Sequence, residues 1–162
     1  MDRNDEHSVA ERDEMEAYLV GMLDDRGEIE LFRTVWKAFG VLDVEVGLTR
    51  RQETLVALTE IYPLKDILSE KRDGLDLIAT GRWLVSPYSI KNNTPEEYAE
   101  LGRALFVYEA FWGVDSKKFD DYVDYECYGR DRVRERSGGF LSERFKRWVD
   151  CPGSWFFETN PD

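Results

Sequence analysis

The residues of this chain that could do chemistry are carboxylates at helical spacing. Glu97 and Glu100 stand three positions apart near the start of one predicted helix, and Asp121 and Asp124 repeat that spacing in the next. Acids three apart lie on adjacent turns of a helix, so two such pairs on antiparallel helices can hold Mg²⁺ against the phosphates of a nucleotide. These four acids are the metal site of the chain if it is a hydrolase.

The spacing of the four acids resembles that of the all-α nucleotide pyrophosphatases, which implies Mg²⁺-dependent hydrolysis of a nucleotide. The run Asp120-Asp121-Tyr122-Val123-Asp124 also matches the short DDxxD string of terpene synthases, although those enzymes need a larger helical cavity than this chain can build. If Phe119, Tyr122 and Val123 face the core, the helical period turns Asp121 and Asp124 away from the core. We therefore expect a solvated helix face here, with no catalytic residues, no metal and no cofactor.

A second candidate is DNA binding by residues 48–87. Two helices followed by a β-hairpin would give the outline of a winged-helix transcriptional regulator. The basic residues that could contact phosphates there are Arg50, Arg51, Lys65, Lys71, Arg72 and Arg82. The competing interpretation is an ordinary helical core with a mixed-charge surface, and the net charge of the chain favours it because like charges repel.

A third candidate is the run from Arg130 to Arg136, in which four arginines alternate with other residues after three tyrosines, Tyr122, Tyr125 and Tyr128. Interleaved Arg and Tyr can stack on the bases of single-stranded nucleic acid. The alternative, which we favour, is that these arginines pair with carboxylates, for which the acidic N-terminal helix is an available partner within one chain or between two.

Several enzyme classes lack their residues in this sequence. His7 is the only histidine and lies in a polar terminus, so Ser-His-Asp, Cys-His and histidine-bound zinc sites are not expected. There is no glycine-rich phosphate-binding motif. With two cysteines in 162 residues we expect reduced thiols at Cys127 and Cys151 rather than a disulfide framework.

The charge of the chain is strongly negative and unevenly spread. The net charge is -12, and residues 1–30 carry eleven acids against three bases. Residues 130–147 carry seven bases against three acids, a local charge of +4. Such a chain repels phosphate backbones and anionic lipid over most of its surface and attracts basic partners, while a saline host would favour the same acidity. The acidic start and the lack of a run of roughly 20 apolar residues predict a cytoplasmic protein.

The elements that would position these residues are mostly helices. Apolar residues at helical spacing predict helices over residues 9–25 and 28–40, and these two can form an antiparallel hairpin. A capping-box pattern at Ser8 and Glu11 starts the first of these helices, and another at Thr49 and Gln52 starts a third helix. Pro63 ends this third helix, and a short helix is predicted from there through Ser69. Residues 75–87 fit either a helix broken at Gly81 or a small β-hairpin.

The second half of the sequence shows the clearest helix start, Thr94-Pro95-Glu96-Glu97, followed by an apolar stripe that runs to Gly113. Another helix is predicted from Ser116 to Gly129. After a break at 137–139, Leu141, Phe145, Trp148 and Val149 suggest a last short helix, and the aromatic tail from Cys151 is expected to dock on the core.

These patterns predict a single mainly α-helical domain over residues 1–162, a bundle of six or seven helices with frayed residues 1–7, in which the segment near 75–87 forms either a helix or one small β-hairpin. We expect it to bind a basic protein without catalysis, as an immunity protein, antitoxin or nucleic-acid mimic does when carboxylates stand where a partner expects phosphates. The sequence also allows a homodimer in which the acidic N-terminal helix of one copy contacts the basic segment 130–147 of the other. The acids expected to contact the partner are Glu11, Asp13, Glu14, Asp115, Asp120, Asp121 and Asp124.

Overall fold

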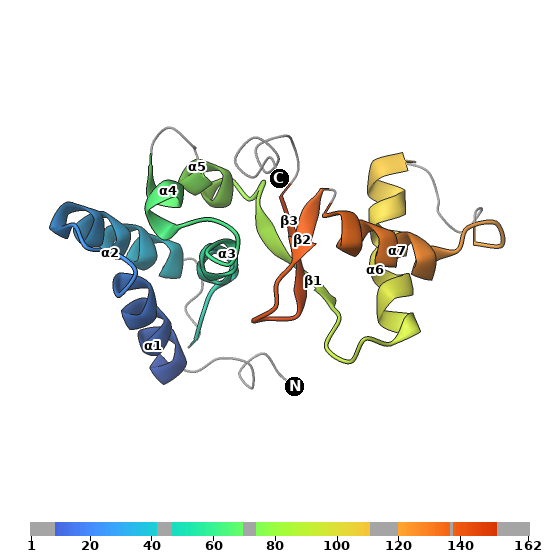
Figure 1. Ribbon diagram of the computed structural model, residues 1–162, viewed down its shortest axis with the longest axis horizontal. Coiled ribbons are helices and arrows are strands. Elements are labelled where there is room, and N and C mark those ends of the chain that lie inside the picture. Colours follow the sequence, from blue (N-terminus) through green and yellow to red (C-terminus); the bar gives the residue numbers. More distant parts are fainter. Residues whose placement is uncertain (1–8, 42–46, 70–73, 111–119, 137, 152–162) are drawn as a thin grey trace. The chain divides into compact units, whose positions relative to one another are not determined.

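The computed structural model describes residues 9–41, 47–69, 74–110, 120–136 and 138–151 (Figure 1). Helices predominate, and a small three-stranded antiparallel sheet accompanies them, so the predicted mainly α-helical fold with one hairpin is confirmed. The contacts divide the chain into two compact units, Met1–Val85 and Ser86–Asp162, which we call the first and the second unit. The prediction of a single domain stays a prediction.

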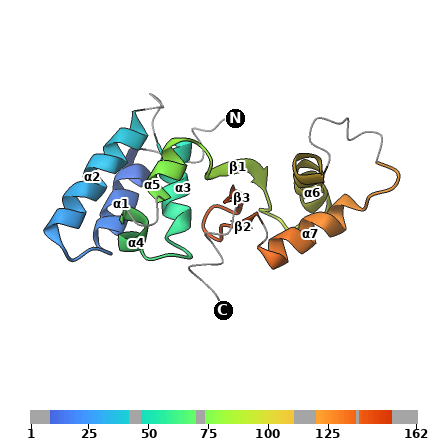
Figure 2. The same ribbon diagram turned by 90° about the horizontal axis from the view of Figure 1, so that it is seen from above.

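The first unit opens with two helices that pack against each other, α1 (Val9–Val20) and α2 (Arg26–Gly40) (Figures 1 and 2). The side chain of Asp25 caps α2 by accepting from the Gly27 amide at 2.6 Å, which satisfies one of the unpaired donors of a helix start. The apolar stripe predicted for α2 is the buried one, with Phe32, Trp36 and Phe39 in the core. The predicted cap at Ser8 lies outside the described residues.

Helix α3 (Arg50–Leu58) begins with the capping box predicted at Thr49 and Gln52. The Thr49 hydroxyl accepts from the Gln52 amide and the Gln52 side-chain oxygen accepts from the Thr49 amide, both at 3.1 Å. The same two side chains also reach the end of α2, where the Thr49 hydroxyl donates to the Phe39 carbonyl and the Gln52 side chain to the Trp36 carbonyl, each at 2.9 Å. One pair of residues therefore joins the end of α2 to the start of α3.

Two short helices follow, α4 (Leu64–Leu68) directly after Pro63 as predicted and α5 (Gly74–Ala79). Residues 75–87 do not form the hairpin considered for them. Helix α5 ends at Ala79, Gly81 turns the chain with a φ of +83°, and strand β1 (Leu84–Ser89) begins. The amides of Arg82 and Trp83 both donate to the Leu77 carbonyl, so the turn completes the end of α5 instead of starting a wing.

The hairpin lies in the second unit, where strands β2 (Gly139–Leu141) and β3 (Arg147–Asp150) pair antiparallel with Phe140 opposite Val149. The strand order in the sheet is β1-β3-β2. The short helix predicted over residues 141–149 was therefore wrong. Its four apolar residues fit the helical spacing, but Phe145 lies in the turn after Ser142, whose hydroxyl accepts from the Phe145 amide at 3.1 Å, and the chain reverses there to form two strands.

Helix α6 (Pro95–Ala110) starts at the predicted cap, and α7 (Tyr125–Glu135) crosses it (Figure 2). The prediction that a helix stops at Gly129 was wrong, because Gly129 lies inside α7. A β-carbon on Gly129 would overlap the Tyr98 carbonyl oxygen, and one on Gly102 would overlap the Tyr125 carbonyl oxygen. These glycines let two helix backbones touch, so at this position glycine marks a crossing and not an end.

The core of the second unit forms where the sheet meets these helices. Trp148 of β3 is fully buried there with Leu101, and Ile90, Tyr98 and Leu105 complete the buried cluster. The Trp148 indole N–H donates to the Asp150 carboxylate at 2.9 Å, which satisfies the one polar atom of that buried ring.

Candidate interaction surfaces

The surface of α1, α2 and the turn between them carries exposed carboxylates that form no ion pair with the described residues. Asp13, Glu14, Asp24 and Glu30 are exposed, and none of them forms an ion pair with any residue in the described part of the chain. Of the two other acids on α1, Glu11 is half-buried and has an interaction partner. No ion pair among the described residues therefore neutralises these four acids, although Arg26 and Arg33 lie one helical turn before and after Glu30. Acids without an ion pair can attract a basic partner from a distance.

Large apolar side chains are exposed among these acids. Tyr18 is 48% exposed, Met22 40% and Leu31 43%. The sequence pattern places Tyr18 and Met22 in the buried stripe of the helix predicted over residues 9–25, but only Leu19 and Leu23 of that stripe are buried. We call the seven residues the acidic hairpin surface: Asp13, Glu14, Tyr18, Met22, Asp24, Glu30 and Leu31.

The sequence offered one signal for this exposure. Glu14 lies one helical turn before Tyr18, and Met22 follows at the same spacing of four, so these three residues follow one line along α1 and the turn after it. A charged residue such as Glu14 is rarely buried, so Tyr18 and Met22, which follow it at helical spacing, are expected at the edge of the buried face, where side chains are partly exposed.

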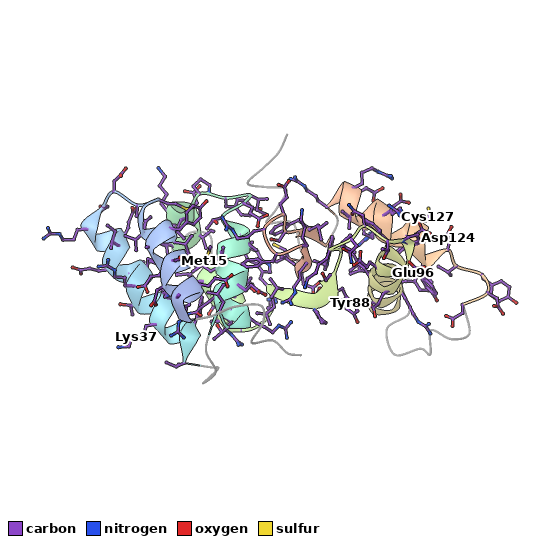
Figure 3. The ribbon with its side chains drawn as sticks, turned by 90° about the horizontal axis from the view of Figure 1, so that it is seen from below. Met15, Lys37, Tyr88, Glu96, Asp124 and Cys127 are labelled. Atoms are coloured by element: carbon purple, nitrogen blue, oxygen red, sulfur yellow. The ribbon has the colours of Figure 1, made fainter. Side chains whose placement is uncertain are left out.

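The acids predicted around residue 120 have structural roles in the second unit. Asp120 pairs with Arg103 at 3.3 Å and accepts from the Tyr125 hydroxyl at 3.3 Å. Asp124 caps α7 by accepting from the Cys127 amide at 3.0 Å, at the end of α7 where Figure 3 labels both residues. Asp121 is exposed, and Asp115 lies outside the described residues. These acids do not share the setting of those on α1.

The predicted packing of this segment was wrong. Tyr122 was expected to face the core, yet it is 84% exposed. Residues 120–124 form a turn and an extended approach to α7 in place of a helix, so the helical period does not apply to them.

The four acids considered for Mg²⁺ do not form a cluster. Glu97 belongs to the capping box of α6, where its carboxylate accepts from the Thr94 amide at 3.0 Å and the Asn92 amide at 3.1 Å. These hydrogen bonds lower the pKa of Glu97 below its ordinary value. Glu100 is exposed. Among the described residues no group of three or more acidic, histidine or cysteine side chains is placed to hold a metal ion.

The arginines considered for DNA binding in the first unit bind the backbone of their own chain. Arg50 donates through Nε to the Val85 carbonyl at 3.2 Å and through Nη2 to the same oxygen, and Arg51 donates to the Ala79 carbonyl at 3.1 Å. Arg82 is exposed, and Arg72 lies outside the described residues. Arg50 and Arg51 thus join α3 to β1 and to the end of α5.

The arginines of α7 pair mainly with neighbours. Arg130 pairs with Glu126 at 2.9 Å and lies 4.1 Å from the Tyr98 ring centre. Arg134 pairs with Asp131 at 2.7 Å. Pairing with carboxylates, which the sequence favoured over nucleic-acid stacking, thus occurs inside the helix itself, and exposed pairs of this kind stabilise a helix by a few tenths of a kcal/mol.

The two cysteines are both free thiols with different surroundings. Cys127 is exposed, and the nearby Asp131 carboxylate raises its pKa above the ordinary value of a thiol. Cys151 is buried, and burial raises its pKa to about 12, with Asp150 adding to the effect. Neither setting lowers a thiol pKa, which a nucleophilic cysteine requires.

Comparison with known proteins finds no match for this chain. No protein-family model matches it, no curated protein matches it, and no solved structure matches it. Within the described ranges no helix is long and apolar enough to cross a membrane.

Proposed function

We propose that this chain acts by binding a basic protein through the acidic hairpin surface, and that it is not an enzyme. The observation that carries the proposal is that exposed carboxylates, which form no ion pair with the described residues, lie together with exposed Tyr18, Met22 and Leu31 on α1, α2 and the turn between them. The acids alone would fit any acidic surface. The apolar side chains add the area that a stable interface has to bury.

The two kinds of side chain have separate roles in such an interface. Carboxylates such as Asp13 and Glu14 steer a positively charged partner toward the surface and suppress wrong partners, mainly through the association rate. Tyr18 and Met22 supply the buried contacts that slow dissociation, since tyrosine is among the residues enriched at the energetic centres of interfaces and methionine adapts to irregular partner surfaces.

The partner that fits this surface has arginines or lysines around an apolar patch. Nucleases and other nucleic-acid-binding proteins carry such basic faces because they bind phosphates. A chain that presents carboxylates to that face blocks it, which is the way an immunity protein, an antitoxin or a nucleic-acid mimic acts. The proposal places this chain in that class.

The test is affinity capture from a low-salt lysate of the source cells, with quantitative mass spectrometry of the bound proteins. Three baits are compared: the unaltered chain, the variant Asp13→Lys/Glu14→Lys, and the charge-matched variant Glu100→Lys/Asp121→Lys, which reverses two exposed acids of the second unit. The expected result is a stoichiometric basic protein that elutes with salt, is lost with the first variant and is kept with the second.

Two outcomes contradict the proposal. If the bound proteins are the same for all three baits, the acidic hairpin surface has no part in binding. If the partner is lost with Glu100→Lys/Asp121→Lys instead, the binding surface lies on the second unit. Thermal unfolding of each bait shows that a lost partner does not reflect an unfolded variant.

A further inference from the structure

The second unit contains two helices followed by a β-hairpin, the order of elements considered from the sequence for residues 48–87, which those residues do not form. Helices α6 and α7 are followed directly by the β2–β3 hairpin, and strand β1 precedes the helices and pairs with β3 (Figure 1). Two helices with a β-hairpin beside them can place a helix and a pair of strands against one duplex, since both fit the major groove of DNA.

Basic residues collect at the turn of this hairpin. Arg144 and Lys146 are exposed in the turn, and Arg147 is half-buried at the start of β3. Lys91 is exposed just past the end of β1, and it lies near the turn because the amide of the preceding residue, Ile90, donates to the Lys146 carbonyl at 2.8 Å. We call these four residues the hairpin patch. Glu143 is the one acid in the turn.

The turn is held in one conformation by its own hydrogen bonds. The Ser142 hydroxyl accepts from the Phe145 amide at 3.1 Å, the Ser142 carbonyl accepts from the Lys146 amide at 2.8 Å, and the Ser142 amide donates to the Arg147 carbonyl at 2.9 Å. The fully buried Trp148 anchors β3 directly after the turn. Bases on a fixed backbone lose less conformational entropy when they bind.

The local charge around these bases is opposite in sign to the net charge of the whole chain. Residues 130–147 have a charge of +4, although the chain totals -12. The arginines on α7 are balanced largely within the helix, by Glu126 and Asp131. By count, α7 carries three bases and three acids, whereas residues 139–147 carry three bases and one acid, so the excess of positive charge falls on the hairpin.

We propose that the hairpin patch binds the phosphate backbone of double-stranded DNA without reading its sequence. The four bases lie in one turn, at the start of β3 and just past the end of β1, where they can contact neighbouring phosphates, and phosphate contacts carry no base specificity. Sequence-specific reading through α7 is not part of the proposal, because the start of that helix carries Asp124 and Glu126, whose charges repel the duplex. This binding would add a second interaction to the one proposed for the acidic hairpin surface and does not depend on it.

The test is fluorescence anisotropy of two labelled 24-base-pair duplexes of unrelated sequence, titrated with the full chain between 50 and 200 mM salt. Four phosphate contacts predict a slope of log K against log salt of about -3.6, or about a 150-fold loss of affinity over this range. The two duplexes are expected to bind equally within about twofold.

A matched pair of variants locates the site. Arg144→Gln/Lys146→Gln removes two bases of the patch and is expected to weaken binding at 50 mM salt about tenfold and to reduce the slope by about two. Lys37→Gln/Lys65→Gln removes two exposed lysines of the first unit, one of them labelled in Figure 3, and is expected to change neither quantity.

Several outcomes would overturn the proposal. They are no binding at 50 mM salt, equal weakening by both variants, and tighter binding to one duplex. A salt-sensitive dimer in sedimentation, lost with Arg144→Gln/Lys146→Gln while DNA stays unbound, would instead assign the patch to a second copy of the chain. If that variant melts below the assay temperature, Lys91→Gln outside the hairpin takes its place, with an expected loss of one unit of slope.

Discussion

The first and second units contain similar carboxylates in opposite situations. On α1 and α2, Asp13, Glu14 and Glu30 are exposed and form no ion pair with the described residues. Around α7, Asp120 pairs with Arg103 and Asp124 caps the helix. The acid density of the sequence is high in both places, so density does not identify a binding surface. The position of each acid relative to helix ends and to arginines separates the two roles.

The units also differ in how their helices meet. In the first unit the side chains of Thr49 and Gln52 connect α2 to α3. In the second unit the backbones of α6 and α7 touch at Gly102 and Gly129. A joint made by side chains tolerates small changes, whereas a backbone contact leaves no atom that can move aside. The sensitivity to substitution should therefore differ sharply between the units.

The largest expected effect is that of Gly129→Ala. The added methyl group meets the Tyr98 carbonyl oxygen, so α7 must move away from α6 and the second unit should lose about 3 kcal/mol of unfolding free energy. The measurement is urea unfolding followed by circular dichroism. Gly21→Ala is the control, because a β-carbon there would lie 3.4 Å from the Tyr18 carbonyl oxygen and its stability should stay within about 0.5 kcal/mol. Equal effects of the two substitutions would contradict the backbone contact.

Thiol labelling can show that this loss falls on the second unit, because the only two cysteines lie there. At pH 8 a pKa of about 12 leaves about one part in ten thousand of Cys151 as thiolate, so it should not react with a disulfide reagent until the unit opens. Cys127 should react without unfolding. Gly129→Ala should speed the labelling of Cys151 and leave that of Cys127 unchanged. Rapid labelling of both thiols in the unaltered chain would contradict the burial of Cys151.

A smaller effect is expected for the cap of α7. Asp124→Ala removes the acceptor for the Cys127 amide and should cost about 1 kcal/mol of unfolding free energy. Asp13→Ala, on α1, removes an acid without a partner and should change stability by less than about 0.5 kcal/mol. If Asp13→Ala proved as costly as Asp124→Ala, the contrast between the two groups of acids would be lost.

The smallest effect is the pH dependence of Glu97. Its pKa is lowered by the backbone amides that it accepts from, so its stabilisation of α6 is fully present above the ordinary glutamate pKa and is lost as the pH falls through the lowered value. Glu97→Gln keeps an acceptor oxygen but not the charge. The difference in melting temperature between the two chains should therefore shrink as the pH falls from 6 to 3. A difference that does not change with pH would contradict a charged cap.

The sequence predicted those parts of the fold that depend on local chemistry. The capping boxes at Thr49 and Thr94 and the buried stripe of α2 follow from residues within a few positions of one another, and they occur as expected. The roles of Gly129 and Trp148 depend on residues far along the chain, on α6 and on the sheet. A pattern read in one window cannot contain that information, and both positions were misassigned.

The candidate surface was predictable only in part. The acidic character of α1 is plain in the sequence, but the exposure of Tyr18 and Met22 depends on how α1 packs on α2. The structural roles of Asp120 and Asp124 likewise depend on where α7 begins. Composition leads us to expect a basic partner, which stays a prediction, and the structure shows that the acids of the two regions differ in their own contacts.

The most direct test of this choice is titration calorimetry of the partner protein against two charge-matched variants at low salt, each with its melting temperature. Asp13→Lys/Glu14→Lys is expected to bind at least about tenfold more weakly than the unaltered chain, about 1.4 kcal/mol, without a lower melting temperature. Glu100→Lys/Asp121→Lys is expected to keep the affinity within about twofold, since neither acid lies on the acidic hairpin surface. Unchanged affinity in the first variant, or lost affinity in the second, would contradict the assignment of binding to α1 and α2.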